Sequence, residues 1–170
     1  MELFPTKFRY LCFQNIIMKY SRLPLQDLKD LEKEFIEFLA INGIPAEDWE
    51  RMKKHDLDKV EGIIDQFSDV VWEGLLRKTE MVELRRKDTL TVCRVTEGKL
   101  ATLVLKSADE KIDLTKEEDI HHVLADIESA DLNIRLDEII KPVTEQLFEL
   151  IQVGFYVSKD AKYLDLFEKA

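Results

Sequence analysis

Residues 79–106, TEMVELRRKDTLTVCRVTEGKLATLVLK, decide the fold of this chain. They are rich in Val, Leu and Thr, and apolar side chains recur at every second position, which is the period of a β-strand. We expect three strands that pair in order as an antiparallel meander, at residues 79–86, 89–96 and 99–106. Glu97-Gly98 fits a two-residue hairpin turn, which would place Val95 opposite Leu100.

One face of this predicted sheet is more apolar than the other, and we take it to be the core face. It would carry Leu90, Val92, Ala101, Leu103 and Leu105. Val82 and Leu84 join this face only if the first turn uses three residues, Arg86-Lys87-Asp88. A two-residue turn would instead place Glu83 and Arg85 inside, which the cost of burying charge argues against. We therefore predict the three-residue turn.

Helical periods flank the predicted sheet on both sides. Apolar residues at three- and four-residue steps predict helices at about 25–39, 45–54, 56–78, 116–129, after Pro142 and after Ser158. Asn42-Gly43 fits a left-handed helix stop, and Thr115 with Glu118 fits a capping box. Alternating apolar residues at 132–136 weakly suggest another short strand. We expect an α+β fold with helices packed on one face of a small three-stranded antiparallel sheet.

The composition is that of a folded protein kept inside the cell. The chain has 170 residues, of which 45% are apolar and only five are Gly and four Pro, so it can build a core. Its two cysteines, Cys12 and Cys93, are far apart in the sequence and form no metal-ligand spacing. No apolar run reaches the ~18 residues that a membrane helix needs. We expect a cytoplasmic protein with no membrane segment.

The first 17 residues differ from the rest of the chain. They show neither a helical nor a strand period, and a more regular pattern begins at Met18. We expect residues 1–17 to be an appendage outside the core, with Met18 as an alternative start. Residues 18–170 are then predicted to form a single α+β domain.

The net charge of −10 is unevenly distributed along the chain. Residues 77–106 carry eight basic and four acidic side chains, whereas both flanks are acidic. A basic sheet is typical of nucleic-acid binding, but such proteins add aromatic rings on which bases stack. No Phe, Tyr or Trp occurs between Glu73 and Leu147. Together with a pI near 4.9, this argues against a nucleic-acid partner.

Four carboxylates at four-residue steps form an acidic strip along the helix at 56–78. These are Glu61, Asp65, Asp69 and Glu73. Like charges at this spacing repel each other on a helix surface, which leaves two interpretations. The strip is either an ordinary solvated face, or a docking surface, with Trp72, for a basic partner or for the protein's own basic hairpin.

The helix at 116–129 carries the only adjacent histidines. Its candidate metal ligands are Glu118, His121, His122 and Asp126. Glu-x-x-His is a spacing used by di-iron bundles, but a second copy on another helix is missing. The same side chains are also what a solvated helix face would carry. No nucleophile elbow, phosphate-binding loop or dinucleotide fingerprint is present, so we expect no cofactor and lean away from an enzyme.

Several stretches resemble an uncharacterised bacterial family of short acidic proteins, known as a domain of unknown function. They are Met18–Leu23, Phe35–Leu39, Gly43–Trp49, Phe67–Glu73 and Ile112–Thr115. The resemblance covers about residues 18–170 and consists of core and cap residues. It implies bacterial origin and adds no activity or site residue.

Two hypotheses of function follow from the sequence. The first is a non-catalytic interaction or regulatory module, with the acidic strip and Trp72 as its surface and a protein as its partner. The second is a metal-binding protein or metal-dependent hydrolase that uses the acidic and histidine residues of the helix at 116–129.

Overall fold

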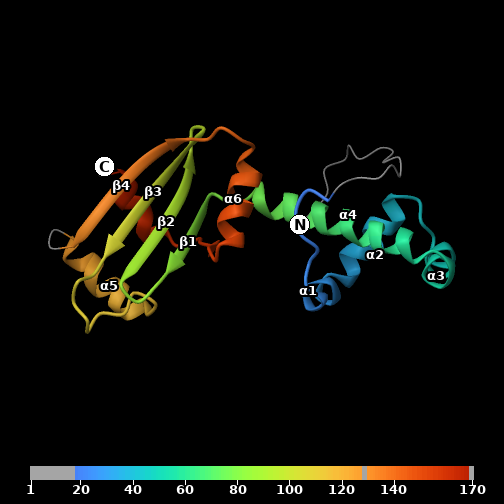
Figure 1. Cartoon of the computed structure of the whole chain (residues 1–170), viewed down its shortest axis with the longest axis horizontal. Helices are drawn as coiled ribbons and strands as arrows, with labels where there is room; N and C mark the ends of the chain where they lie inside the picture. Colours follow the sequence, from blue (N-terminus) through green and yellow to red (C-terminus); the bar gives the residue numbers. More distant parts are fainter. Residues whose placement is uncertain (1–17, 128–129, 169–170) are drawn as a thin grey trace. The chain divides into compact units, whose positions relative to one another are not determined.

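The computed structural model describes residues 18–127 and 130–168 of the chain and is α+β (Figure 1). The chain divides into two compact units, one ending at Leu75 and the other beginning at Leu76. That residues 18–170 act as one domain stays a prediction. The expected appendage at residues 1–17 lies outside the described residues.

The first unit is helical among its described residues. Its helices are α1 (Leu25–Asp30), α2 (Glu32–Ile41), α3 (Ala46–His55) and α4 (Leu57–Leu76). The single helix expected over residues 25–39 is interrupted at Leu31, where φ is −101° and ψ is 22°. The predicted stop is confirmed, because Asn42 is the C-cap of α2 and Gly43 adopts a φ of 70°.

Aromatic side chains fill the core of the first unit. Phe67 of α4 is fully buried, and the ring of Phe35 packs edge-on against it at a centroid distance of 5.0 Å. Trp49 of α3 contacts the same Phe35 ring at 5.3 Å, again edge-on. These rings therefore join α2, α3 and α4 around the apolar stripe that the sequence predicts for the last of them.

A five-stranded antiparallel sheet is the centre of the second unit (Figure 1). Its strands are β1 (Met81–Arg85), β2 (Thr89–Thr96), β3 (Lys99–Lys106), β4 (Asp131–Glu138) and β5 (Tyr156–Val157). Their order is β4-β3-β2-β1-β5, so the predicted meander is present as the three central strands. The prediction of three strands is wrong because β4 and β5 pair with the outer edges of the meander. A strand of two residues, β5, has no detectable period in the sequence.

The predicted second turn is confirmed, and the predicted first turn is wrong. Val95 pairs with Leu100 across Glu97-Gly98, whose φ angles are 44° and 80°. The first hairpin, however, pairs Arg85 with Leu90, and Arg86 and Thr89 exchange backbone hydrogen bonds, which leaves only Lys87 and Asp88 in the turn. Glu83 therefore lies opposite Val92 on the core face of the sheet, where only 2% of it is exposed.

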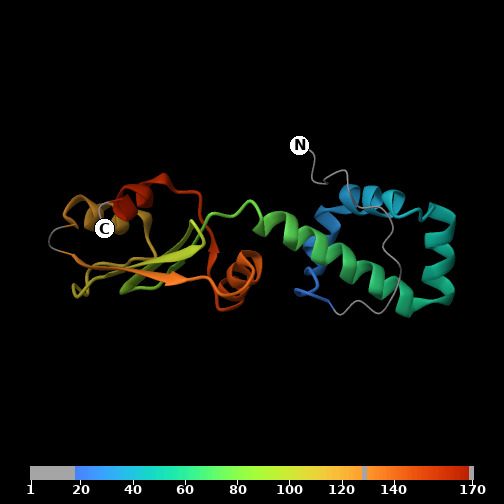
Figure 2. The same ribbon diagram turned by 90° about the horizontal axis from the view of Figure 1, so that it is seen from above.

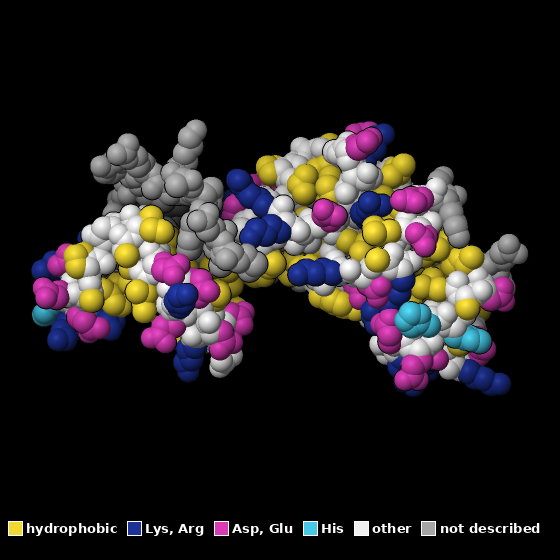
Figure 3. All heavy atoms as spheres, turned by 180° about the vertical axis from the view of Figure 1, so that it is seen from behind, with side chains coloured by type: hydrophobic (Ala, Val, Ile, Leu, Met, Phe, Trp, Pro, Cys, Tyr) yellow, Lys and Arg dark blue, Asp and Glu magenta, His cyan; other side chains and the backbone are white. Residues whose placement is uncertain are grey.

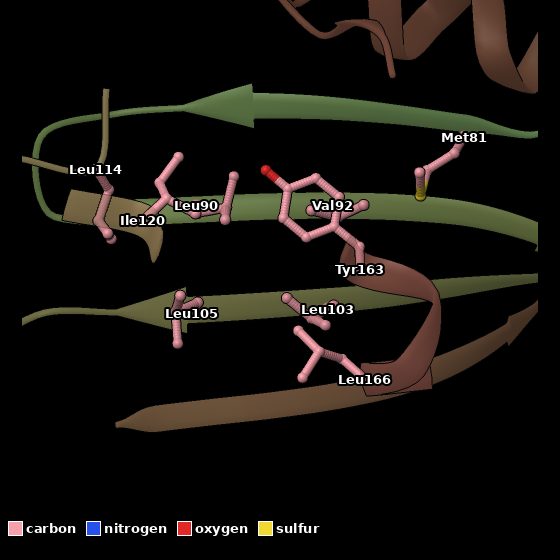
Figure 4. Close-up of a cluster of buried hydrophobic side chains, with 9 residues drawn as sticks. All are labelled: Met81, Leu90, Val92, Leu103, Leu105, Leu114, Ile120, Tyr163 and Leu166. Carbon is pink, nitrogen blue, oxygen red and sulfur yellow. The ribbon is translucent and has the colours of Figure 1, made fainter. Parts of the chain in front are cut away.

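The core face of the sheet is covered by the helices that follow β3 and β5 (Figure 2). These are α5 (Glu117–Ala125), the 3-10 helix η2 (Ala161–Tyr163) and α7 (Leu164–Glu168). Figure 4 shows Tyr163 and Leu166 lying over Val92 and Leu103. All five residues predicted for this face are buried, as expected. A further helix, α6 (Val143–Gln152), contacts β1.

Two predicted helix caps differ from the structure. Thr115 does not cap α5; it donates to the carboxylate of Asp113, Oγ1 to Oδ1 at 2.6 Å. The hydroxyl of Ser158 donates to Glu83 at 3.0 Å, and Asp160 is the residue that caps η2. In each case the hydroxyl donates to a nearby carboxylate and does not act as a helix cap.

We expect Leu103→Ala to lower the free energy of unfolding by ~2–5 kcal/mol, because it removes buried methyl groups and leaves a cavity in the core. Leu103 has no exposed surface. Urea denaturation followed by circular dichroism measures the effect. Ile140→Ala is the control, since Ile140 is 91% exposed. An equal loss in both variants would contradict this assignment of the core.

Candidate functional site

The acidic strip of α4 is covered by the chain's own segment Lys19–Leu23, which we call the anchor segment. Asp69 accepts hydrogen bonds from two successive backbone N–H groups, those of Lys19 at 2.7 Å and Tyr20 at 2.8 Å. The backbone N–H of Leu23 donates to the Ser68 hydroxyl at 3.2 Å. Side chains of α4 thus bind backbone N–H groups of the anchor segment.

Trp72 belongs to the same surface. Its indole Nε1–H donates to the backbone carbonyl of Ser21 at 2.9 Å. Side chains of α4 therefore bind both kinds of backbone group, N–H and C=O, in a segment that is neither helix nor strand. This explains why an indole lies beside the acidic strip.

Side-chain charges complete the contact between the anchor segment and the acidic strip. The Lys19 ammonium lies 3.0 Å from Glu73, and the Tyr20 hydroxyl donates to the same carboxylate at 2.6 Å. Arg22 donates to Asp65 at 2.6 Å and also binds Glu61. Its hydrogen bonds to Asp65 and then Glu61 raise the pKa of Arg22 above its usual range. The repulsion expected along the strip is relieved by cations from a distant part of the sequence.

The sequence predicts the acidic strip but not its occupant. Lys19 and Arg22 are three residues apart, and their side chains reach carboxylates about two helical turns apart on α4. A short basic spacing of this kind is common in proteins and does not by itself indicate a contact. The signal was therefore present but not specific.

We predict that Asp69→Ala releases the anchor segment, because it removes the acceptor of two backbone N–H groups. The measurement is hydrogen exchange at Lys19 and Tyr20, which should become faster than in the wild type. Asp58→Ala removes an exposed carboxylate from the first turn of the same helix and is the matched control. Unchanged protection in Asp69→Ala would contradict the assigned contact.

A second polar cluster surrounds Glu83 on the core face of the sheet. The Glu83 carboxylate lies 2.8 Å from the Arg85 guanidinium on the same strand and accepts the Ser158 hydroxyl at 3.0 Å. Tyr156 of β5 is its cross-strand neighbour. Burial first, and then the Glu83 carboxylate, raise the pKa of Tyr156. The strand β5 and the residues after it thus enclose this charge.

Arg85 connects Glu83 to the surface of the unit. It is 17% exposed and also donates to Glu117 of α5 at 2.7 Å. Lys162 binds the same Glu117 carboxylate, and Lys162 first and Arg85 second lower the pKa of Glu117. A chain of alternating charges therefore runs from the buried carboxylate to α5 and η2. The sequence did not predict this chain of charges, because the three-residue turn expected there would place Glu83 on the face of the sheet opposite the core.

Tyr163 lies over the core face of the same sheet (Figure 4). Its hydroxyl is buried and has no hydrogen-bond partner among the described residues. Burial, and then the nearby Glu83 charge, raise the pKa of Tyr163. Each charged group in this cluster lies close to a group of opposite charge. Such an arrangement is suited to fixing the register of paired strands.

We expect Arg85→Met to cost ~3–5 kcal/mol of unfolding free energy, because it leaves the Glu83 carboxylate buried without its cation. The double variant Glu83→Gln with Arg85→Met should be more stable than Arg85→Met alone. Urea denaturation of the wild type, both single variants and the double variant measures this coupling. Additive losses would contradict the buried pair.

The candidate metal ligands of α5 are not brought together. Glu118, His121, His122 and Asp126 are all exposed, and Figure 3 shows histidine side chains at the surface. His121 lies 3.3 Å from Glu117. Within residues 18–127 and 130–168, no three His, Cys, Asp or Glu side chains are placed to hold a metal ion. The second hypothesis therefore gains no support from the geometry.

The described surface of each unit has a hollow. One, of about 330 Å³, is lined in part by His122, Asp126 and Asp131. The other, of about 550 Å³, lies between α2 and α3 and is mostly apolar, with Ile36 and Trp49 in its lining. Neither contains a cluster of converging polar groups like the one that the anchor segment meets. In the described part of the chain, no helix combines the length and apolar character that crossing a bilayer requires.

Comparison with known proteins identifies the family. The model of DUF6495, described as a family of unknown function, matches residues 18–170, and the chain therefore belongs to this family. The resemblance noted in the sequence to a family of unknown function is confirmed. Searches of curated proteins and of solved structures found no match.

Proposed function

We propose that this member of the DUF6495 family is a non-catalytic protein-interaction module that binds a short basic segment on the acidic strip of α4. The observation that supports the proposal is the contact with the anchor segment. Asp69 and Trp72 bind backbone groups, while Glu61, Asp65 and Glu73 bind cations. A surface that binds one such segment has the chemistry to bind another.

The anchor segment acts in this proposal as a competitor tethered to the site. A tethered ligand has a high effective concentration, so a partner binds only to the fraction of molecules in which the strip is open. Lys19 and Arg22 set that fraction, because they supply the cations. The module is therefore regulated by its own chain.

A fluorescent peptide with the sequence KYSRL, that of residues 19–23, tests the proposal. We expect Lys19→Ala with Arg22→Ala to bind this peptide at least ~10-fold more tightly than the wild type, because the competitor is weakened. Asp65→Lys with Asp69→Lys should bind it no better than background. Fluorescence anisotropy at low salt measures both affinities, which should fall as salt is added.

Two controls separate binding from folding. The peptide KYSRL with both basic residues replaced by Ala should not bind, and circular dichroism should show that each variant keeps its helices. Charge reversal at Asp65 and Asp69 should also lower the melting temperature, because Asp69 accepts two backbone hydrogen bonds from the anchor segment. Absence of peptide binding by the folded Lys19→Ala, Arg22→Ala variant would refute the proposal.

A further inference from the structure

The outer edge of β4 is the longest strand edge in the sheet that no described strand pairs with. β4 has eight residues and ends the strand order on one side, whereas β5 ends it on the other side with only two (Figure 1). An antiparallel edge of this length exposes a row of backbone N–H and C=O groups. It is therefore a template on which another strand can pair.

The direction of these backbone groups follows from two hydrogen bonds. Ile139 N–H donates to Gly98 on the β3 side at 3.2 Å, so odd-numbered residues of β4 direct their backbone groups toward β3. Leu132 N–H bonds instead to the nearby carbonyl of Ala130 at 3.0 Å. Even-numbered residues, including Leu132 and Ile134, therefore direct their N–H and C=O groups outward.

The sequence at this edge is complementary to itself when read in the opposite direction. With Asn133 opposite Asn133 of a second copy, Asp131 lies opposite Arg135 and Leu132 opposite Ile134. Ala130 then lies opposite Leu136, whose side chain is 60% exposed. Over residues 130–136, apolar residues thus face apolar residues on the core side of the sheet, and Asp131 faces Arg135 on the other side, twice by symmetry.

The neighbouring registers lack this match. A shift that centres the pair on Ile134 places Asp131 opposite Asp137, and one that centres it on Arg135 places Arg135 opposite itself. Like charges directly opposite each other destabilise a strand pair. Of the three registers, only the one centred on Asn133 places opposite charges opposite each other, and it has a two-fold axis through Asn133.

From this we propose that two copies of the chain pair through their β4 edges, antiparallel and centred on Asn133, to form a dimer with one continuous sheet. Leu132 and Ile134 of each copy exchange backbone hydrogen bonds with Ile134 and Leu132 of the other. The local bond from Leu132 to Ala130 is replaced in the process. This inference is independent of the proposed function, because it uses no residue of the acidic strip.

Light scattering after size-exclusion chromatography, over a range of concentrations, tests the dimer. We expect a mass of twice 20.0 kDa at the high end. Arg135→Asp places acid opposite acid twice and should weaken dimerisation at least ~10-fold. The swapped variant Asp131→Arg with Arg135→Asp restores both pairs and should dimerise like the wild type. Arg135 is 69% exposed, so these variants should keep the fold.

Two further variants test the hydrogen bonds and the register. Ile134→Pro removes an outward N–H without removing a bond to β3, and should yield a folded monomer. Asn133→Cys should form a disulfide between copies on mild oxidation, because the two Cα atoms at the axis lie within reach of such a bond. Asp137→Cys, on the same side of the strand but away from the axis, is the control and should not.

A monomer at every concentration, or a dimer that Arg135→Asp and Ile134→Pro leave intact, would overturn the proposal. So would a swapped variant that is as weak as Arg135→Asp, because the register would then be wrong. Binding of the peptide KYSRL should be unchanged in all β4 variants, so failure of the dimer and failure of the proposed function give different results.

Discussion

The burial of the Glu83 carboxylate is the constraint on which the second unit depends. A two-residue turn between β1 and β2 fixes which side chains of β1 face the core, and Glu83 is one of them. A buried carboxylate is tolerated only if opposite charge and hydrogen bonds surround it. Arg85 supplies the charge from the same strand, but it cannot supply every bond that the carboxylate needs.

The remaining partners come from the end of the chain. Ser158 donates to Glu83 directly after β5, and Tyr163 lies over the same region of the sheet. β5 is too short to be held by its backbone pairing with β1 alone. The polar contact and the apolar contacts of Tyr163 and Leu166 therefore act together to hold the C-terminal segment on the sheet. In this unit a single charge specifies which segment closes the core.

The sequence predicted the parts of the fold that depend on periodicity. The alternation at residues 89–106 gave the correct register of β2 and β3, because Glu97-Gly98 permits only one short turn there. The first turn could not be predicted in the same way. Lys87 and Asp88 fit turns of either length, and the cost of burying Glu83 was weighed without the Arg85, Ser158 and Tyr156 contacts that offset it.

The sequence likewise predicted only part of the candidate site. The four-residue steps of Glu61, Asp65, Asp69 and Glu73 place these carboxylates on one face of α4, as expected. Their spacing shows that the face needs cations but not where the cations come from. Residues 19–23 have no helical or strand period of their own, so pattern analysis gives them no structure and no partner.

Both proposed surfaces bind backbone groups, and this is why sequence motifs do not reveal them. Asp69 and Trp72 bind peptide groups of residues 19–21, and β4 presents peptide groups along its outer edge. Every residue type except proline offers the same N–H and C=O groups. Specificity is then left to a few flanking charges, Lys19 and Arg22 at one surface and Asp131 and Arg135 at the other. Because charged residues are abundant in this chain, only the register imposed by the backbone distinguishes these four from the rest.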